Sequence, residues 1–210
     1  GLSSSMQVGN VAELALDEGI AMRIKFDGAP PPQRELYFRG PVLTRFDGRN
    51  WTSRGGGDGF DAAVAPGPAD LQVAGEPIRY EVTLEPSNRP WLLTLDVAGT
   101  PPQLPPNRHA RMTADMQWLA YRPITDLLRY RAESHPQFRY GLTGWDKRPR
   151  RDFSPDLQLP PGFNPRTLAL AEELRQSTGG DPDALVRAAL ERLRTGGYTY
   201  TLEPGVYGQH

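Results

Sequence analysis

The sequence lacks cysteine altogether and contains few lysines and histidines, and each shortage excludes a kind of chemistry. Without cysteine, the 210 residues cannot form a disulfide, a thiolate metal site or a cysteine nucleophile. No apolar run approaches the ~20 residues that cross a bilayer. The formal net charge of −1 gives no overall field that would attract nucleic acid or an anionic membrane.

None of the three histidines is placed for catalysis or metal binding. His109 lies in a proline-rich turn, His135 directly precedes a proline, and His210 is the last residue. No two of them are four residues apart, which is the spacing by which one helix face presents two imidazoles to zinc. We expect surface or turn positions for all three.

Other nucleophile and phosphate-binding patterns are also missing. No Gly-x-Ser-x-Gly elbow occurs. The stretch GGGDG at residues 55–59 lacks the lysine and the strand–loop–helix context of a phosphate cradle, which favours an exposed loop. The sequence therefore predicts no catalytic, cofactor-binding or metal-binding residue, and no cofactor, within this chain.

Two further features have a plain structural interpretation beside a functional one. The basic residues at 147–151 could contact an acidic substrate, lipid headgroups or a nucleic acid. Too few aromatic residues interleave with them for a single-strand binder, so a solvated linker is favoured. The four tryptophans are Trp51, Trp91, Trp118 and Trp145. They could form a ligand platform, but three lie in apolar phase on expected strands, which favours core packing.

Alternating apolar and polar residues predict half-buried β-strands in several places. The apolar faces carry Ile20, Met22, Ile24 and Phe26; then Tyr80, Val82 and Leu84; then Trp91, Leu93, Leu95 and Val97; and then Leu128, Tyr130 and Ala132. Asp47-Gly48, between the runs 42–46 and 49–52, predicts a tight hairpin. Residues 53–76 are rich in glycine, alanine, proline and aspartate, which predicts a long exposed loop.

The pattern changes to helical after a proline-broken linker at residues 145–163. Asn164 and Asp181 are expected to cap two helices, each with proline at its first position, and Gly179 is expected to end the first helix. A strand is expected to begin at Tyr198. The predicted fold is mainly β with a C-terminal helical hairpin (α+β). Its β part, residues 1–144, is an antiparallel sandwich or open barrel, and residues 164–210 form a separate unit.

Two segments resemble one known family. ELYFRGPVLTRFDGRNW, at residues 35–51, resembles the N-terminal signature of the TgpA-type bacterial transglutaminase-like membrane proteins. ALVRAALERLRTGGYTYTLEPGVYG, at residues 184–208, is similar to the entry into their transglutaminase-like core. The two segments occur in the expected order and at the expected separation, so the resemblance covers nearly the whole chain.

The resemblance implies a polytopic inner-membrane protein whose periplasmic region begins with a β-rich domain and continues into a papain-like Cys-His-Asp core. The family's cysteine lies beyond the residues matched here, so we expect the chain to stop before its nucleophile. No catalytic residue is carried over, and His210 is not the family's catalytic histidine. Leu190 and Leu193, which would face the rest of the core, are expected to be exposed.

Three functional hypotheses follow. In the first, the chain is a non-catalytic N-terminal fragment of a periplasmic thiol acyltransferase or protease, and its β domain positions the core or binds a substrate or partner. The partners implied are a protein or peptide substrate, the remainder of the core and the inner membrane that anchors the parent, but no nucleic acid. In the second, the chain is a complete, non-enzymatic β-sandwich module for binding or adhesion in the cell envelope. In the third, the parent keeps the fold as an inactive scaffold.

Overall fold

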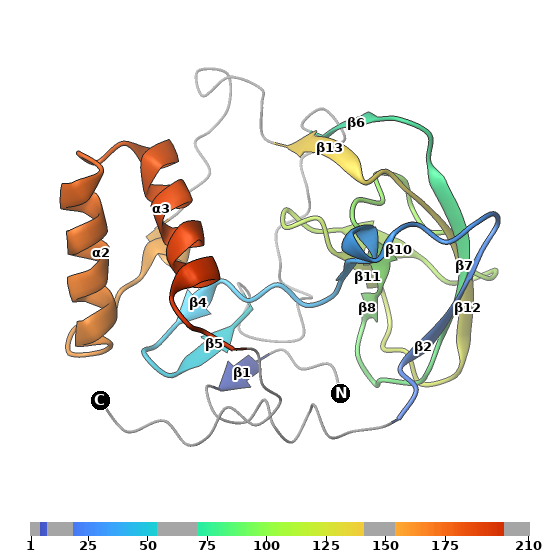
Figure 1. Cartoon of the computed structure of the whole chain (residues 1–210). Helices are drawn as coiled ribbons and strands as arrows, with labels where there is room; N and C mark the ends of the chain where they lie inside the picture. The colour runs from blue at the N-terminus through green and yellow to red at the C-terminus, as the bar shows by residue number, and fades with distance from the viewer. Residues whose placement is uncertain (1–4, 8–18, 54–70, 141–153, 200–210) are drawn as a thin grey trace, which may run out of the picture.

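The structure is a computed structural model that describes residues 5–7, 19–53, 71–140 and 154–199. Short antiparallel strands make up most of it, and two helices follow them in the chain (Figure 1). The helices α2 (Pro165–Ser177) and α3 (Pro182–Thr195) lie on the opposite side of the molecule from strands β2, β7 and β12 (Figure 1). The predicted fold class, mainly β with a C-terminal helical hairpin, is confirmed.

The main sheet has the strand order β12–β7–β2. Its central strand is β7 (Ile78–Leu84), flanked by β2 (Met22–Phe26) and β12 (Leu128–Ser134). Both flanking strands run antiparallel to β7. The alternation predicted for these strands is confirmed, because every second side chain of β7 and β12 is buried while the charged residues between them face outward.

A second layer covers the buried face of the main sheet. It contains the sheet β10–β11–β8, formed by β10 (Ala110–Met112), β11 (Trp118–Ala120) and β8 (Trp91–Leu92). Beside it, β9 (Thr94–Leu95) pairs with β3 (Phe38–Arg39), which follows the short 3-10 helix η1 (Gln33–Glu35). Side chains from both layers form one cluster of buried residues, so the β part is a two-layered, open arrangement and not a closed barrel.

Some local predictions were wrong. Residues 91–95 were expected to have one buried face, but all five are buried, because the two short strands β8 and β9 are covered on both sides. Within the predicted loop at 53–76, residues 71–74 form strand β6 (Leu71–Ala74), which pairs with the distant β13 (Gln137–Tyr140). Tyr198 lies outside any strand, and most of the strand expected after it falls outside the described residues.

The two helix caps differ from each other. The carboxylate of Asp181 accepts a hydrogen bond from the backbone N–H of Ala184 at 3.0 Å, as predicted. Asn164 has left-handed backbone angles (φ 52°, ψ 49°) and makes no capping hydrogen bond with its side chain. Asn164 therefore occupies the predicted N-cap position, but its side chain does not cap the helix, because a capping side chain needs an extended backbone to reach the first turn. Gly179, at φ +63°, ends α2 as expected.

A buried hydroxyl network joins the two layers. The Ser134 hydroxyl donates to the carbonyl of Leu95 at 2.8 Å, so its only proton is engaged. The Tyr80 hydroxyl therefore donates to the Ser134 oxygen at 2.8 Å, and its own oxygen accepts the N–H of Leu95 at 2.8 Å. Burial raises the pKa of Tyr80, which keeps the phenol neutral. Every polar group of this network has a partner, and β7, β9 and β12 are linked through it.

The network gives a first test. Replacing Tyr80 by Phe should lower the free energy of unfolding by about 1–3 kcal/mol, because the N–H of Leu95 is left buried without an acceptor. Urea denaturation measures this difference. The control is Tyr121→Phe, which removes a hydroxyl from a side chain that is 58% exposed and should change stability very little. Equal effects of the two substitutions would contradict the role assigned to Tyr80.

Candidate functional site at the junction with the helices

The two histidines that the structure describes take part in a ring contact and in backbone pairing. His109 is exposed and its ring meets that of Tyr121 edge to face, with the centroids 6.4 Å apart. His135 exchanges backbone hydrogen bonds with Val97 and is a structural element of the β part. Within the described ranges, no group of three or more metal-ligating side chains comes together, and no helix is long and apolar enough to cross a membrane. His210, the GGGDG stretch at 55–59 and the basic run at 147–151 lie outside these ranges.

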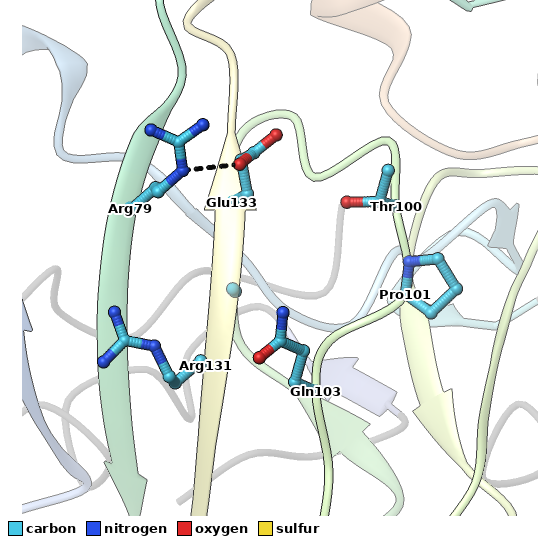
Figure 2. Close-up of a pocket in the computed structure, with 7 residues that line it drawn as sticks. Arg79, Thr100, Pro101, Gln103, Arg131 and Glu133 are labelled. Carbon is cyan, nitrogen blue, oxygen red and sulfur yellow. Dashed lines mark hydrogen bonds and ion pairs between the residues drawn. The ribbon is translucent and has the colours of Figure 1, made fainter.

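A small hollow of about 140 Å³ lies against β7 and β12 (Figure 2). Its charged groups are already paired: Arg79 donates to Glu133 at 2.8 Å, and Arg131 pairs with Asp27. The hollow is thus part of a row of cross-strand ion pairs on the outer face of the main sheet. Such exposed pairs contribute little to stability and leave no free charge for a ligand.

The family-like segment at 35–51 contains a structural ion pair. Arg39 on β3 binds the carboxylate of Asp96 through two hydrogen bonds, of 2.8 and 2.6 Å, and donates to the carbonyl of Asp115 at 3.3 Å. Both charged side chains are less than a fifth exposed. The hydrogen bond to Asp96 raises the pKa of Arg39 further. The fork-shaped contact ties β3 to the residues after β9 and to the β10–β11 turn, so Arg39 has a structural role.

The same segment continues into the hairpin predicted at Asp47-Gly48. Strands β4 (Arg45–Phe46) and β5 (Asn50–Thr52) are shorter than the predicted runs, but they pair as expected, and β1 (Ser5–Gln7) adds a third strand. The Asp47 carboxylate accepts the side-chain N–H of Asn50 and the backbone N–H groups of Asn50 and Arg49. These hydrogen bonds lower the pKa of Asp47 to about 2.

The tryptophans divide between the core and this hairpin. Trp91 and Trp118 are buried in the core, as predicted. Trp51 is half-buried and stacks on Phe46 across the hairpin, with the ring centroids 4.7 Å apart. Trp145 lies outside the described residues. The stacked pair stiffens the small sheet β1–β5–β4, which lies between the two-layered β part and the helices (Figure 1).

The chain entering the helices lies on this hairpin. The 3-10 helix η3 (Ser154–Leu157) contacts β4, and Phe163, two residues before α2 begins, covers Gly48. Gly48 is buried at φ +106°, and a Cβ built on it would lie only 2.5–2.7 Å from three carbons of the Phe163 ring. Glycine is therefore required at this position for two reasons: the turn has a positive φ, and the Phe163 ring occupies the space that a Cβ would need. We refer to this packing as the Phe163–Gly48 contact.

A larger hollow, of about 530 Å³, opens beside this contact. The hairpin contributes five of its lining residues and the chain entering the helices contributes two; they are Arg45, Phe46, Asp47, Asn50, Thr52, Gln158 and Pro160. The volume is within the range of ligand-binding clefts, and the position is at a boundary between structural units, where such clefts are common. We refer to it as the junction hollow.

The helices leave an apolar face uncovered. No residue of α2 or α3 is buried. On α3, Val186 is 59% exposed, Leu190 45% and Leu193 62%. The prediction that Leu190 and Leu193 are exposed is confirmed. An amphipathic helix gains most of its stability from packing its apolar face, so this face is ready to be covered by another part of a protein.

Comparisons with known proteins agree with this architecture. Residues 1–141 match the family model described as the TgpA N-terminal domain. The protein-glutamine gamma-glutamyltransferase of Pseudomonas aeruginosa is 39% identical over 208 residues, which are 99% of this chain but 29% of the relative. The chain therefore spans less than a third of that relative's length.

Solved structures extend the match to the whole fold. The crystal structure of the periplasmic domain of TgpA from P. aeruginosa matches with a TM-score of 0.81 at 36% identity, over 99% of this chain and 67% of that one. The same domain bound to ethylmercury matches with a TM-score of 0.79 at 38% identity, over 99% and 68%. The chain belongs to the TgpA N-terminal domain family, the β-rich part of a transglutaminase-like protein.

Sequence reasoning identified the hairpin but not the junction. Asp47-Gly48 predicted a turn, and the turn alone accounts for the glycine. Phe163 stands in a proline-rich stretch whose pattern indicates a linker. The signal that the sequence offered was an aromatic residue two positions before a helix start.

The Phe163–Gly48 contact can be tested with matched glycines. Gly48→Ala should destabilise the chain by about 1–3 kcal/mol more than Gly162→Ala, because both glycines have positive φ but only the first meets a ring. At Gly162, no described atom lies within 4 Å of the added Cβ. Urea denaturation gives the stabilities, and limited proteolysis reports opening of residues 154–163.

A double variant completes the test. If the ring causes the extra loss, Phe163→Ala should relieve most of it, so the energies of Gly48→Ala and Phe163→Ala will not add. Simple addition of the two losses would show that the ring and the glycine do not interact.

Proposed function

We propose that this chain is the non-catalytic N-terminal part of a periplasmic thiol acyltransferase, and that its β domain holds the start of the catalytic core in position. The observation that carries the proposal is similarity along 99% of the chain to a curated protein-glutamine gamma-glutamyltransferase. In this proposal, residues 1–144 are the β domain, 145–163 the linker and 164–210 the beginning of the core.

The chemistry of acyl transfer supports a non-catalytic role for this chain within a larger enzyme. Acyl transfer from a glutamine amide through a thioester needs a thiolate, a base and an oriented carbonyl. This chain has no cysteine, so the thiol would be supplied by sequence beyond these 210 residues in the parent. The base would then come from the same region, because neither His109 nor His135 lines either of the two hollows described above.

The exposed face of α3 supports a positioning role. Residues of a continuing core would cover Leu190 and Leu193 and gain roughly 25 cal/mol for each Å² of apolar surface removed from water. The Phe163–Gly48 contact would then fix where this core begins relative to the β domain. A complete adhesion module, the alternative considered from the sequence, gives no reason for two adjacent helices without a buried side chain.

Location and partners follow from the relatives. The matched structures are of a periplasmic domain, so we place this chain in the periplasm, within a parent anchored in the inner membrane. Its partners would be the remainder of the core and a peptide or protein substrate. The proposal includes no nucleic-acid partner, and the net charge of −1 agrees with this.

Activity measurements test the proposed chemistry. Ammonia release from a blocked glutamine peptide should be absent with the 210-residue chain and present with the longer periplasmic region of the parent gene. Replacing the cysteine of that region by alanine should abolish the release. Equal turnover with and without the cysteine would exclude thiol catalysis and leave a scaffold.

A stability comparison tests the covered face separately. Leu193→Ser should be nearly neutral in the 210-residue chain, where the side chain is 62% exposed, and should cost about 2–4 kcal/mol in the longer protein, where it would be buried. The control is Leu127→Ser, at a residue of the β part that is 57% exposed, which should be neutral in both. A neutral Leu193→Ser in the longer protein would contradict the proposed packing.

A further inference from the structure

The junction hollow is bordered by a guanidinium that has no partner among the residues that the structure describes. Among the described residues, the side chain of Arg45 forms no ion pair and no hydrogen bond, in contrast to Arg79 and Arg131 in the smaller hollow. A free arginine on a convex surface is ordinary. Arg45 is different because it borders a space of about 530 Å³ that is large enough for several peptide atoms.

The remaining lining groups have the chemistry of a peptide site. Thr52 lies directly opposite Arg45 across the hairpin, and Asn50 follows on the same face of β5. The opposite wall carries the side-chain amide of Gln158. Amides and hydroxyls both donate and accept hydrogen bonds, which suits the alternating N–H and C=O groups of an extended peptide. The ring of Pro160 adds apolar surface, while the ring of Phe46 stacks on Trp51.

The formal charges of the lining cancel, and its one cation is the guanidinium of Arg45. Arg45 contributes one positive charge and Asp47 one negative charge. The Asp47 carboxylate accepts three N–H groups of its own turn, which leaves it little acceptor capacity for a ligand. A guanidinium matches the two oxygens of a carboxylate in a fork-to-fork geometry. A phosphate dianion would need further cations, and the lining provides none.

The walls of the hollow are held in place before any ligand arrives. The hairpin wall is stiffened by the stacking of Phe46 on Trp51, and the opposite wall is fixed by the Phe163–Gly48 contact. Beside Gln158, Leu157 and Leu159 are 73% and 72% exposed.

We propose that the junction hollow binds an acidic peptide, with one carboxylate on Arg45 and adjoining peptide groups on Asn50, Thr52 and Gln158. This goes beyond the positioning role. It rests on the proposed function only in treating the ligand as part of the substrate of the parent protein. Binding in the 210-residue chain is independent of catalysis, so failure of one does not imply failure of the other.

The test uses the 210-residue chain and a pair of blocked peptides, acetyl-Ala-Leu-Glu-Ala-amide and its glutamine twin. In ¹⁵N NMR titrations, the glutamate peptide should shift the side-chain signals of Arg45, Asn50 and Gln158. The glutamine peptide should bind about tenfold more weakly or worse, because the charged hydrogen bonds are lost.

Variants locate the site. Arg45→Gln should weaken binding of the glutamate peptide about tenfold or more, and Arg45→Lys should retain part of the affinity. Arg122→Gln is the control, because Arg122 is also an exposed arginine with no ion pair among the described residues. It should leave the affinity unchanged.

Three results would overturn the proposal. The first is equal binding of the two peptides, and the second is unchanged affinity in Arg45→Gln. The third is displacement of the peptide by inorganic phosphate at an equal concentration, which would identify a general anion site. Unaltered backbone spectra of the variants ensure that a lost affinity is not a lost fold.

Discussion

The two layers of the β part depend on the Tyr80 hydroxyl. It lies in the core, donates to Ser134 and accepts from the backbone of Leu95, so it connects the main sheet to the short strands that cover it. A short strand cannot satisfy its own backbone groups with neighbours alone, and a buried hydroxyl with complete partners compensates for this. Because this network fixes β9, it also fixes β3 and the ion pair between Arg39 and Asp96, from which the chain continues to the hairpin.

The hairpin connects the β part to the chain that enters the helices. The carboxylate of Asp47 accepts the hydrogen bonds that hold its turn, and the ring of Phe163 packs on Gly48. The chain entering α2 therefore lies on a surface that the β part positions. The helices themselves bury no side chain. Their position is therefore determined by the junction and by whatever covers α3. A positioning domain requires such an arrangement, with a rigid scaffold, a specific contact at the start of the next unit and an apolar face left for it.

The sequence predicted those features that depend on neighbours in the chain. The alternation in β7 and β12, the Asp47-Gly48 turn and the Asp181 cap follow from local patterns. Features set by distant contacts were missed. The alternation at residues 91–95 predicted only one buried face, whereas Leu92 and Thr94 between the predicted positions are buried too. Strand β6 is formed by pairing with the distant β13. The junction hollow escaped prediction for the same reason, since Arg45 and Gln158 are brought together by the fold alone.

The family resemblance extended the functional prediction further than the residues did, because the cysteine of a thiol acyltransferase is absent from these 210 residues. The central claim is that the β domain positions helices that belong to a larger core. Hydrogen exchange of the α3 amides, compared between the 210-residue chain and the longer periplasmic region, tests it most directly. The account predicts fast exchange in the short chain and strong protection in the long one. Equal protection in both would contradict it.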